Sequence, residues 1–532
     1  MQGRTSTSPS ELQLTAATWL DRAAGWGLGG VLLASILCFG GQVSWYPAAL
    51  AGSVTLVALL IGLRWLMLGS ANIVRGPWLL IGFAILALGT LQALVLPAQA
   101  VAGLSAQAPG TLARLEVEAT GAVRDAPQSE DGPHGPLSIS ANRSATVRWL
   151  IQFITLGVVF VLTSTFARSF RHTQMLLNAL ILALAVAVAV AGMQLIGDAP
   201  GAFGLWTVGQ GPAWAPSTTD LLAGPITYVL RPIPTEGVPG PAWLMKRPLT
   251  PFAIGPWIAG PGAFLALAAL TMPLLCGSIL DKLSPKGSVE PIGVRLRARG
   301  GVPALALHLM LWIAASGLIG FLGGLPLTAA VGVGVAACCL LASRKTRMTR
   351  AALGLGVVFL AASVACSCLG DAAGRPAGAS WLAKPGGWGQ VRGLWSNAVV
   401  VAKSFPIAGV GLGASGDLWP YLKRHDVTSS TAQSAVLQWW AETGCAGVLL
   451  VGIGLVWMVC RAPGAWSAIG TNERPMAAGL LGSVLGLLAF SCIHWSIEQP
   501  AIALASAAIL GCMNRWLSGG TDLFVDDPRF LI

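Results

Sequence analysis

Charged side chains are scarce in this chain of 532 residues, because Lys, Arg, Asp and Glu together make up only 10% of it. An ordinary soluble domain carries about 25%, so a water-soluble enzyme of this length is excluded. A disordered chain needs low hydrophobicity and high charge, and 55% of these residues are hydrophobic. The composition therefore indicates an integral membrane protein that crosses the bilayer several times.

The sequence also predicts neither a signal peptide nor a disulfide framework. Residues 1–22 have neither an apolar core nor a cleavage site, and a secretory signal peptide requires both. All ten cysteines lie in or at the ends of apolar runs, where free cysteine behaves as a small apolar residue. Cys366 and Cys368 are too closely spaced and too isolated for a zinc site. We therefore expect no disulfides and no metal.

Long apolar runs are what the sequence does contain. A membrane-spanning helix needs about 20 predominantly apolar residues, and the alternation typical of a barrel is absent, so the spans must be helices. The predicted fold class is all-α, with about twelve transmembrane helices. They are expected at 26–43, 46–68, 76–97, 147–167, 174–196, 251–279, 301–319, 322–343, 351–370, 444–461, 476–495 and 499–514.

The positions of Lys and Arg predict the orientation of these spans, because cytoplasmic loops are enriched in basic residues. With both termini in the cytoplasm, the inner segments hold the whole net charge of +11 and the outer segments sum to zero. The basic residues lie in small groups between apolar runs rather than in a stripe, so we expect no nucleic-acid partner. Short inner loops leave no room for a nucleotide-binding domain, so no nucleotide is expected either.

This topology divides the chain into five regions. It predicts a cytoplasmic tail at 1–25, a bundle of nine spans at 26–370, an outer loop at 371–443, three final spans at 444–514, and a second cytoplasmic tail at 515–532. Two further outer loops are expected within the bundle, at 98–146 and 197–250.

The outer loop 371–443 is the part with the most pattern. Helical spacing predicts a helix over 391–404 that ends at Phe405-Pro406, then a turn with three glycines, then a short helix over 434–442. Gly411 to Gly416 formally match the glycine fingerprint of dinucleotide-binding proteins. That fingerprint needs a preceding strand, and none is expected here. Close backbone packing in a turn is the better explanation of these glycines.

Here the chain resembles the bacterial O-antigen ligase and O-antigen polymerase superfamily of multi-span membrane glycosyltransferases. The resemblance lies in SFPIAGVGLGASGDLWPY and LQWWAETGCAGVLL, and it extends to LQALVLPAQAVAGLSAQ and FSCIHWSIEQPAIALASA. The matching positions are Arg392, Trp395, Pro406, Gly409, Gly411, Leu437, Gln438, Glu442, Gly444 and Gly447.

Membership would imply the substrates and the location of the reaction. The donor would be an undecaprenyl-diphosphate-linked glycan, and the acceptor a lipid A–core sugar or another lipid-linked repeat. Transfer would take place on the outer face of the bacterial inner membrane, without a metal or another cofactor. Such a reaction needs cations to hold the diphosphate leaving group and an acceptor for the proton of the incoming hydroxyl.

Three cations are candidates for the diphosphate contact. Arg392 matches the family pattern, and an Arg fork suits phosphate oxygens. Lys403 lies eleven residues later on the same predicted helix. Arg247, just before the sixth expected span, is a displaced substitute for the arginine that the family carries at the start of that span. Arg392 also has a simpler interpretation, as an arginine near lipid headgroups.

Two residues are candidates for the catalytic base. The family carries a His-x-His-Asn stretch where this chain has Thr431, Ala432, Gln433 and Ser434. His425, beside Asp426, is the nearest imidazole and titrates near neutral pH when unperturbed. Glu442 matches the family glutamate, either as a base or as a structural residue near the membrane surface. The departure at 431–434 leaves open an inactive relative that acts as a scaffold in glycan assembly, and a lipid or glycan transporter is a further alternative.

Overall fold

The computed structural model describes residues 11–37, 46–68, 76–97, 100–101, 137–167, 170–197, 206–207, 211–212, 261–284, 301–343, 346–372, 387–415, 432–470, 473–495 and 499–518. Within these ranges the chain is all-α apart from two small antiparallel pairs of strands. The strands are β1 (Val95–Leu96) with β2 (Leu137–Ser138), and β3 (Trp206–Thr207) with β4 (Gly211–Pro212).

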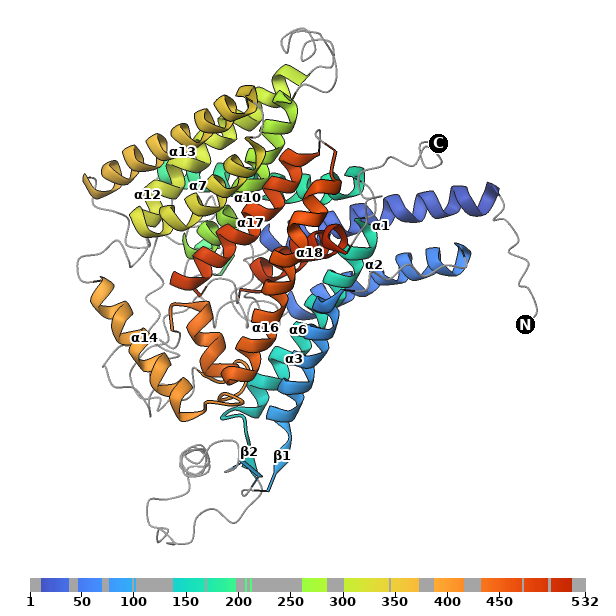
Figure 1. Cartoon of the computed structure of the whole chain (residues 1–532), viewed down its shortest axis with the longest axis vertical. Helices are drawn as coiled ribbons and strands as arrows, with labels where there is room; N and C mark the ends of the chain where they lie inside the picture. Colours follow the sequence, from blue (N-terminus) through green and yellow to red (C-terminus); the bar gives the residue numbers. More distant parts are fainter. Residues whose placement is uncertain are drawn as a thin grey trace.

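Twelve helices make up the described structure (Figure 1). They are α1 (Glu11–Leu37), α2 (Tyr46–Leu68), α3 (Pro77–Ala93), α6 (Arg143–Phe166), α7 (Phe170–Gly197), α10 (Pro261–Leu283), α12 (Gly301–Ala342), α13 (Thr346–Ala372), α14 (Gly387–Ser404), α16 (Ala435–Ala468), α17 (Arg474–Ile493) and α18 (Pro500–Leu517).

Nine of the described helices are long and apolar enough to cross a membrane, so the chain is a multi-pass membrane protein. The sequence had predicted about twelve spans. The first expected span lies in α1, which starts at Glu11, inside the expected tail, and carries Asp21 and Arg22. The third corresponds to the 17-residue α3. The seventh and eighth form the single element α12.

Helix α12 folds back on itself at Gly324, whose backbone has φ of 62° and ψ of −179°. Trp312 packs on Phe359 of α13 with ring centroids 6.2 Å apart. A Cβ at Gly332 would lie 3.4 Å from the same ring. In a straight helix these two positions would be about 30 Å apart, so the two halves of α12 run in opposite directions, as the two expected spans do.

Helix α10 forms the centre of the bundle, because its whole apolar stretch is buried. It packs against α12 and α17 (Figure 1). Glycines bring these backbones together, since a Cβ at Gly277 would overlap the Pro475 carbonyl. Residues 251–260, where the sixth span was expected to begin, lie outside the described residues.

Helix α17 has its two ends at opposite ends of the bundle. Its first turn, at Pro475, packs on Gly277 of α10. At its other end, the carbonyl of His494 accepts a hydrogen bond from the Ala435 backbone N–H at the start of α16, at 3.4 Å. Twenty helical residues span about 30 Å, the thickness of the hydrocarbon core. We call the end with Ala435, β1 and β2 the β1–β2 end.

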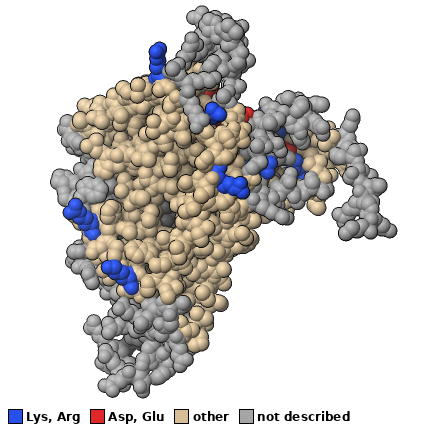
Figure 2. All heavy atoms as spheres, in the orientation of Figure 1, with Lys and Arg blue, Asp and Glu red and all other residues tan. Residues whose placement is uncertain are grey.

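The surface of the bundle matches the scarcity of charge in the sequence. Figure 2 shows a broad face of the described residues without Lys, Arg, Asp or Glu, and the basic residues lie at its margins. Helices α2, α3 and α16 expose large apolar side chains, including Leu66, Leu80 and Val459. Such a face suits contact with lipid rather than water.

Candidate functional site

Residues 405–415, which we call the docked segment, follow α14 and pack into the β1–β2 end of the bundle. Backbone hydrogen bonds tie it to two neighbours. The Val410 N–H donates to the Ala441 carbonyl at 3.0 Å, and the Val410 carbonyl accepts from the Ala141 N–H at 2.9 Å. Thr146 of α6 donates its hydroxyl to the Leu412 carbonyl at 2.9 Å. The docked segment therefore joins α16 to the start of α6.

Gln92, near the end of α3, also holds the docked segment in place through side-chain hydrogen bonds. Its side chain is wholly buried. The amide nitrogen donates to the Ala408 carbonyl and, at 2.9 Å, to the Glu442 carbonyl. The amide oxygen accepts from the Leu412 N–H at 3.1 Å. One side chain thus satisfies three backbone groups from two distant parts of the chain.

Two glycines allow the docked segment to lie against α16. Gly409 has φ of 70° and Gly444 has φ of 62°, a conformation that favours glycine. A Cβ at Gly409 would overlap the Glu442 backbone, and a Cβ at Gly444 would overlap the Ile407 carbonyl. Close backbone packing is therefore the role of Gly409 and Gly444. The sequence predicted such packing for Gly411, where a Cβ would overlap Ser140. Gly444 also bends α16, so that residues 435–443 form the short helix expected before the tenth span.

Glu442 lies at the bend in α16 with its side chain buried. One carboxylate oxygen accepts from the Gly413 N–H at 2.9 Å. The other accepts from the Ser415 hydroxyl at 2.7 Å and from the Gln438 amide at 3.3 Å. These three donors satisfy and orient the carboxylate, and they fix the end of the docked segment. The structural interpretation of Glu442 thus has direct geometric support.

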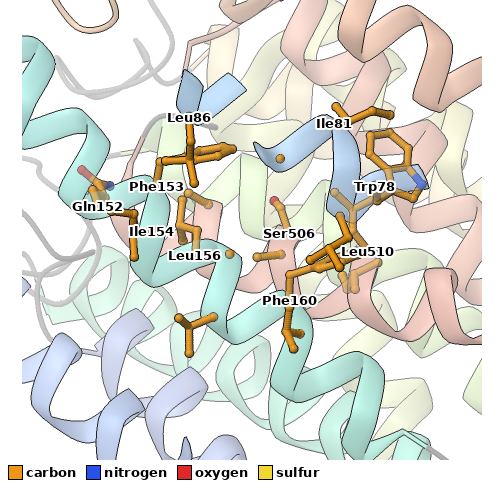
Figure 3. Close-up of a pocket in the computed structure, with 18 of the residues that line it drawn as sticks. Trp78, Ile81, Leu86, Gln152, Phe153, Ile154, Leu156, Phe160, Ser506 and Leu510 are labelled. Atoms are coloured by element: carbon orange, nitrogen blue, oxygen red, sulfur yellow. The ribbon is translucent and has the colours of Figure 1, made fainter. Parts of the chain in front are cut away.

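A cavity of about 810 Å³ lies among α2, α3, α6, α16, α17 and α18, within the range of ligand pockets. Its lining is mostly aliphatic and aromatic (Figure 3), and Glu442, Gln152 and Ser506 are the polar side chains among the residues that line it. Phe83 and Ile154 line the cavity and are also 60% and 51% exposed. The cavity therefore opens between α3 and α6, on the lipid-facing surface.

The two ends of this cavity differ in chemistry. At the β1–β2 end, Trp149 of α6 lies 5.8 Å from Trp439 of α16, measured between ring centroids. Gly413 of the docked segment packs over Trp149, and Glu442 and Gln152 face the same region. Away from this end the lining is apolar apart from Ser506, whose hydroxyl donates to the Ile502 carbonyl of its own helix. A molecule with a polar head and a long apolar chain matches this gradient.

The two cations predicted on one helix lie on α14. Arg392 and Lys403 are both exposed, and a spacing of eleven residues places them on the same helix face. The opposite face packs Leu394 and Ala398 against Ala432, just before α16. Neither cation lines the cavity. The structure thus places Arg392 and Lys403 on one exposed face of α14, whereas His425 and Arg247 lie outside the described residues.

His494 also lies at the β1–β2 end, directly after α17. Its side chain is buried and packs near Phe490 and Trp495, with ring centroids 5.3 and 6.3 Å away. Burial lowers the pKa of the imidazole to about 4, so it is neutral at physiological pH. The sequence places His494 at the outer end of the eleventh expected span, where interhelical hydrogen bonding is its expected use, and it gives Gln92 no role. The one signal in the sequence that could have identified Gln92 is its position near the end of an apolar run, because a buried amide group needs hydrogen-bond partners.

In the described ranges no three His, Cys, Asp or Glu side chains come together to hold a metal ion. Two cysteine thiols, Cys276 on α10 and Cys339 on α12, lie 3.7 Å apart. They are in the interior of the bundle and belong to no group of polar ligands.

The chain was also compared with known proteins. It matches no model of a protein family, and no curated protein is similar to it in sequence. The resemblance to the O-antigen ligase and polymerase superfamily therefore rests on the residues quoted above.

Proposed function

We propose that this protein transfers glycans from an undecaprenyl-diphosphate carrier to an envelope acceptor, on the outer side of the bacterial inner membrane. The observation that supports this most is the cavity that opens to lipid and has a polar, aromatic end beneath the docked segment. A polyprenyl chain would enter between α3 and α6, and its diphosphate would lie at the β1–β2 end. The acceptor would be a lipid A–core sugar or a second lipid-linked repeat.

The chemistry of transfer assigns tasks to the residues at that end. The acceptor hydroxyl oxygen forms a bond to the anomeric carbon, the bond from that carbon to the diphosphate breaks, and undecaprenyl diphosphate leaves with the electron pair. Negative charge grows on the leaving group, so a cation that tightens on it lowers the barrier. Arg392 is our candidate, because it is exposed on α14, the helix that leads into the docked segment, and has a fork of donors. Arg247 remains a predicted second cation.

The proton of the acceptor hydroxyl needs a base. Glu442 already accepts three hydrogen bonds, which favours a positioning role, with its carboxylate holding residues 413–415 over the cavity. His425 remains the predicted base. The same observation favours the scaffold alternative, in which the donor binds but is not transferred, and the experiment below separates the two.

Purified protein in nanodiscs would be given an undecaprenyl-diphosphate-linked glycan, and both binding and transfer would be measured. We expect Arg392→Ala to lower transfer by about 10²–10³-fold, the cost of losing a contact that tightens in the transition state. Arg392→Lys should restore only part of the rate, because a point charge does not reproduce the fork. Binding without transfer by the unmodified protein would favour the scaffold, and absence of binding would contradict the proposal.

The cavity is tested by filling it. Ser506 lies in the wall of the cavity (Figure 3), so Ser506→Phe should weaken donor binding about tenfold or more while the protein stays folded. Ser53→Phe is the matched control, because Ser53 is exposed on α2 and does not line the cavity. Equal binding by both variants would exclude the cavity as the site of the lipid chain.

A further inference from the structure

The start of α3 and the end of α18 meet at the end of the bundle opposite the β1–β2 end, which we call the far end. Helix α3 runs from Pro77 towards β1, so its start lies at the far end. Helix α18 begins soon after His494, at the β1–β2 end, and its 18 residues run away from it. The two meet closely, because a Cβ on Gly76 would overlap the side-chain amide of Asn514.

The start of α3 has free hydrogen-bond donors. The first N–H groups of a helix have no partner within the helix. The residue before α3 is Gly76, which has no side chain to accept from them, and Pro77 follows it. These N–H groups and the helix dipole together create partial positive charge, so such a terminus attracts anions. A free helix start alone does not define a binding site, and Asn514 provides a second observation.

Asn514 is a wholly buried polar side chain. Neither its amide nitrogen nor its amide oxygen has a hydrogen-bond partner in the described part of the chain, and no other described side chain has two such buried atoms. Buried polar groups nearly always have partners, because an unsatisfied one is costly. Gln92 provides the contrast at the other end of α3, where its buried amide satisfies three backbone groups. An unsatisfied amide beside free helix N–H groups indicates a ligand that bonds to both.

This contact borders the apolar part of the cavity. Trp78, two residues after Gly76, and Leu510, one helical turn before Asn514, both line the cavity, and in Figure 3 they lie on the side away from Gln152. Residues four apart share a helix face, so Asn514 continues the cavity-lining face of α18. A polar contact beside an apolar cavity that opens to lipid suits a phosphate that carries acyl chains.

We propose that Asn514 and the start of α3 bind the phosphate of a membrane phospholipid from the leaflet at the far end. The Asn514 amide nitrogen would donate to one phosphate oxygen and the Trp78 N–H to another. The acyl chains would lie at the opening of the cavity between α3 and α6. Inorganic phosphate would use the same donors, but it would leave the apolar surface beside them uncovered. The site lies at the opposite end from the docked segment, so it does not rest on the proposed function.

Three probes test the site on the unmodified protein. They are dioleoyl phosphatidylglycerol, dioleoylglycerol, which has the same chains without the phosphate, and inorganic phosphate. Native mass spectrometry of delipidated protein in a mild detergent would measure binding of the two lipids. We expect phosphatidylglycerol to bind about tenfold more tightly, as hydrogen bonds to a charged group allow, and an equal concentration of inorganic phosphate not to displace it. Equal binding of the two lipids would overturn the proposal, and displacement by inorganic phosphate would show a site for the free ion.

Variants of Asn514 separate a phosphate site from a helix cap. Asn514→Leu and Asn514→Asp should both lose most of the preference for phosphatidylglycerol, the first because it has no donor and the second because a carboxylate repels phosphate. If Asn514 only capped α3, aspartate would serve equally well, and Asn514→Asp would keep both the melting temperature and the preference. Ser467→Asp is the matched control, because it adds the same charge at an exposed position near the far end of α16.

A measurement without any variant locates the phosphate directly, in case the Asn514 variants do not fold. Phosphatidylglycerol with a photoreactive diazirine in its headgroup would be bound to the unmodified protein and irradiated. We expect the label on peptides that contain the start of α3 or the end of α18. A label confined to other helices, or an unchanged preference in folded Asn514→Leu and Asn514→Asp, would contradict the proposal. No glycan donor is used, so the proposed function is tested separately.

Discussion

The Gln92 side-chain amide and the Glu442 backbone carbonyl form a hydrogen bond of 2.9 Å across 350 residues of sequence. The same amide group holds the docked segment through Ala408 and Leu412. Helix α3, the docked segment and the bend in α16 therefore share one buried side chain. The position of Glu442 at the end of the cavity depends on this junction.

Replacing Gln92 tests that dependence. Gln92→Leu leaves the Ala408 carbonyl and the Leu412 N–H without their side-chain partner, and each buried unsatisfied group costs about 1–3 kcal/mol. The Glu442 carbonyl keeps its hydrogen bond from the Gly411 N–H, at 3.2 Å. We expect a clear loss of thermal stability in detergent, together with faster proteolysis within residues 405–415. Thr90→Ala is the control, because Thr90 is exposed and bonds only its own helix. Equal melting temperatures for the two variants would show that Gln92 does not hold the segment.

Gly444 gives a second test of the junction. Gly444→Ala places a methyl group against the Ile407 carbonyl at a backbone φ of 62°, so we expect the docked segment to be displaced and the protein to be destabilised by about 2 kcal/mol or more. Gly452→Ala in the same helix meets nothing within 4 Å and should be neutral or stabilising, since alanine favours helix. Thermal unfolding of both variants measures the difference, and a harmless Gly444→Ala would contradict the packing described here.

Much of the helical layout was predictable because apolar length alone indicates a membrane helix. The sequence also predicts the short helix before Gly444 and the glycine turn at 409–413 correctly, because Phe405-Pro406 and the glycines interrupt the helical pattern. The number of spans was not. The sequence does not show that α3 would have only 17 residues, or that α1 would begin at Glu11, with Asp21 paired to Arg64 on α2.

The site was harder to predict than the fold. Spacing placed Arg392 and Lys403 on one helix face, because that depends only on helical geometry. Gln92 and His494 take part through contacts with segments far away in the chain, and no local pattern encodes such contacts. The resemblance pointed to Glu442, but only the three donors around its carboxylate indicate that it orients the docked segment.

The buried His494 predicts a dependence of stability on pH. Its pKa is about 4 in the folded protein, against about 6.5 when unfolded. Between these values the unfolded chain binds more protons, so the free energy of unfolding falls as the pH falls from 6.5 towards 4. We expect the melting temperature in detergent to drop less between pH 7.5 and 5 in His494→Gln than in the unmodified protein. Parallel curves would show that His494 does not contribute.

The orientation of the chain is tested with reporters that are active only outside the cytoplasm. Lys282 lies at the end of α10 that packs on the first turn of α17, whereas the docked segment lies near the other end of α17, about 30 Å away. These two regions therefore lie on opposite sides of the membrane. Basic residues are concentrated on the Lys282 side, at 282–299 and 344–350, which predicts that this side is cytoplasmic.

A periplasmic reporter fused after Gly416 should accordingly be active, and the same reporter fused after Arg347 should be inactive. Immunoblots of the fusions serve as the control for expression, so that a silent reporter is not mistaken for a cytoplasmic one. The reverse pattern would place Arg392, Lys403 and Glu442 on the cytoplasmic side. That result would contradict the proposed transfer reaction, because the donor glycan and the envelope acceptor would then lie across the membrane from these residues.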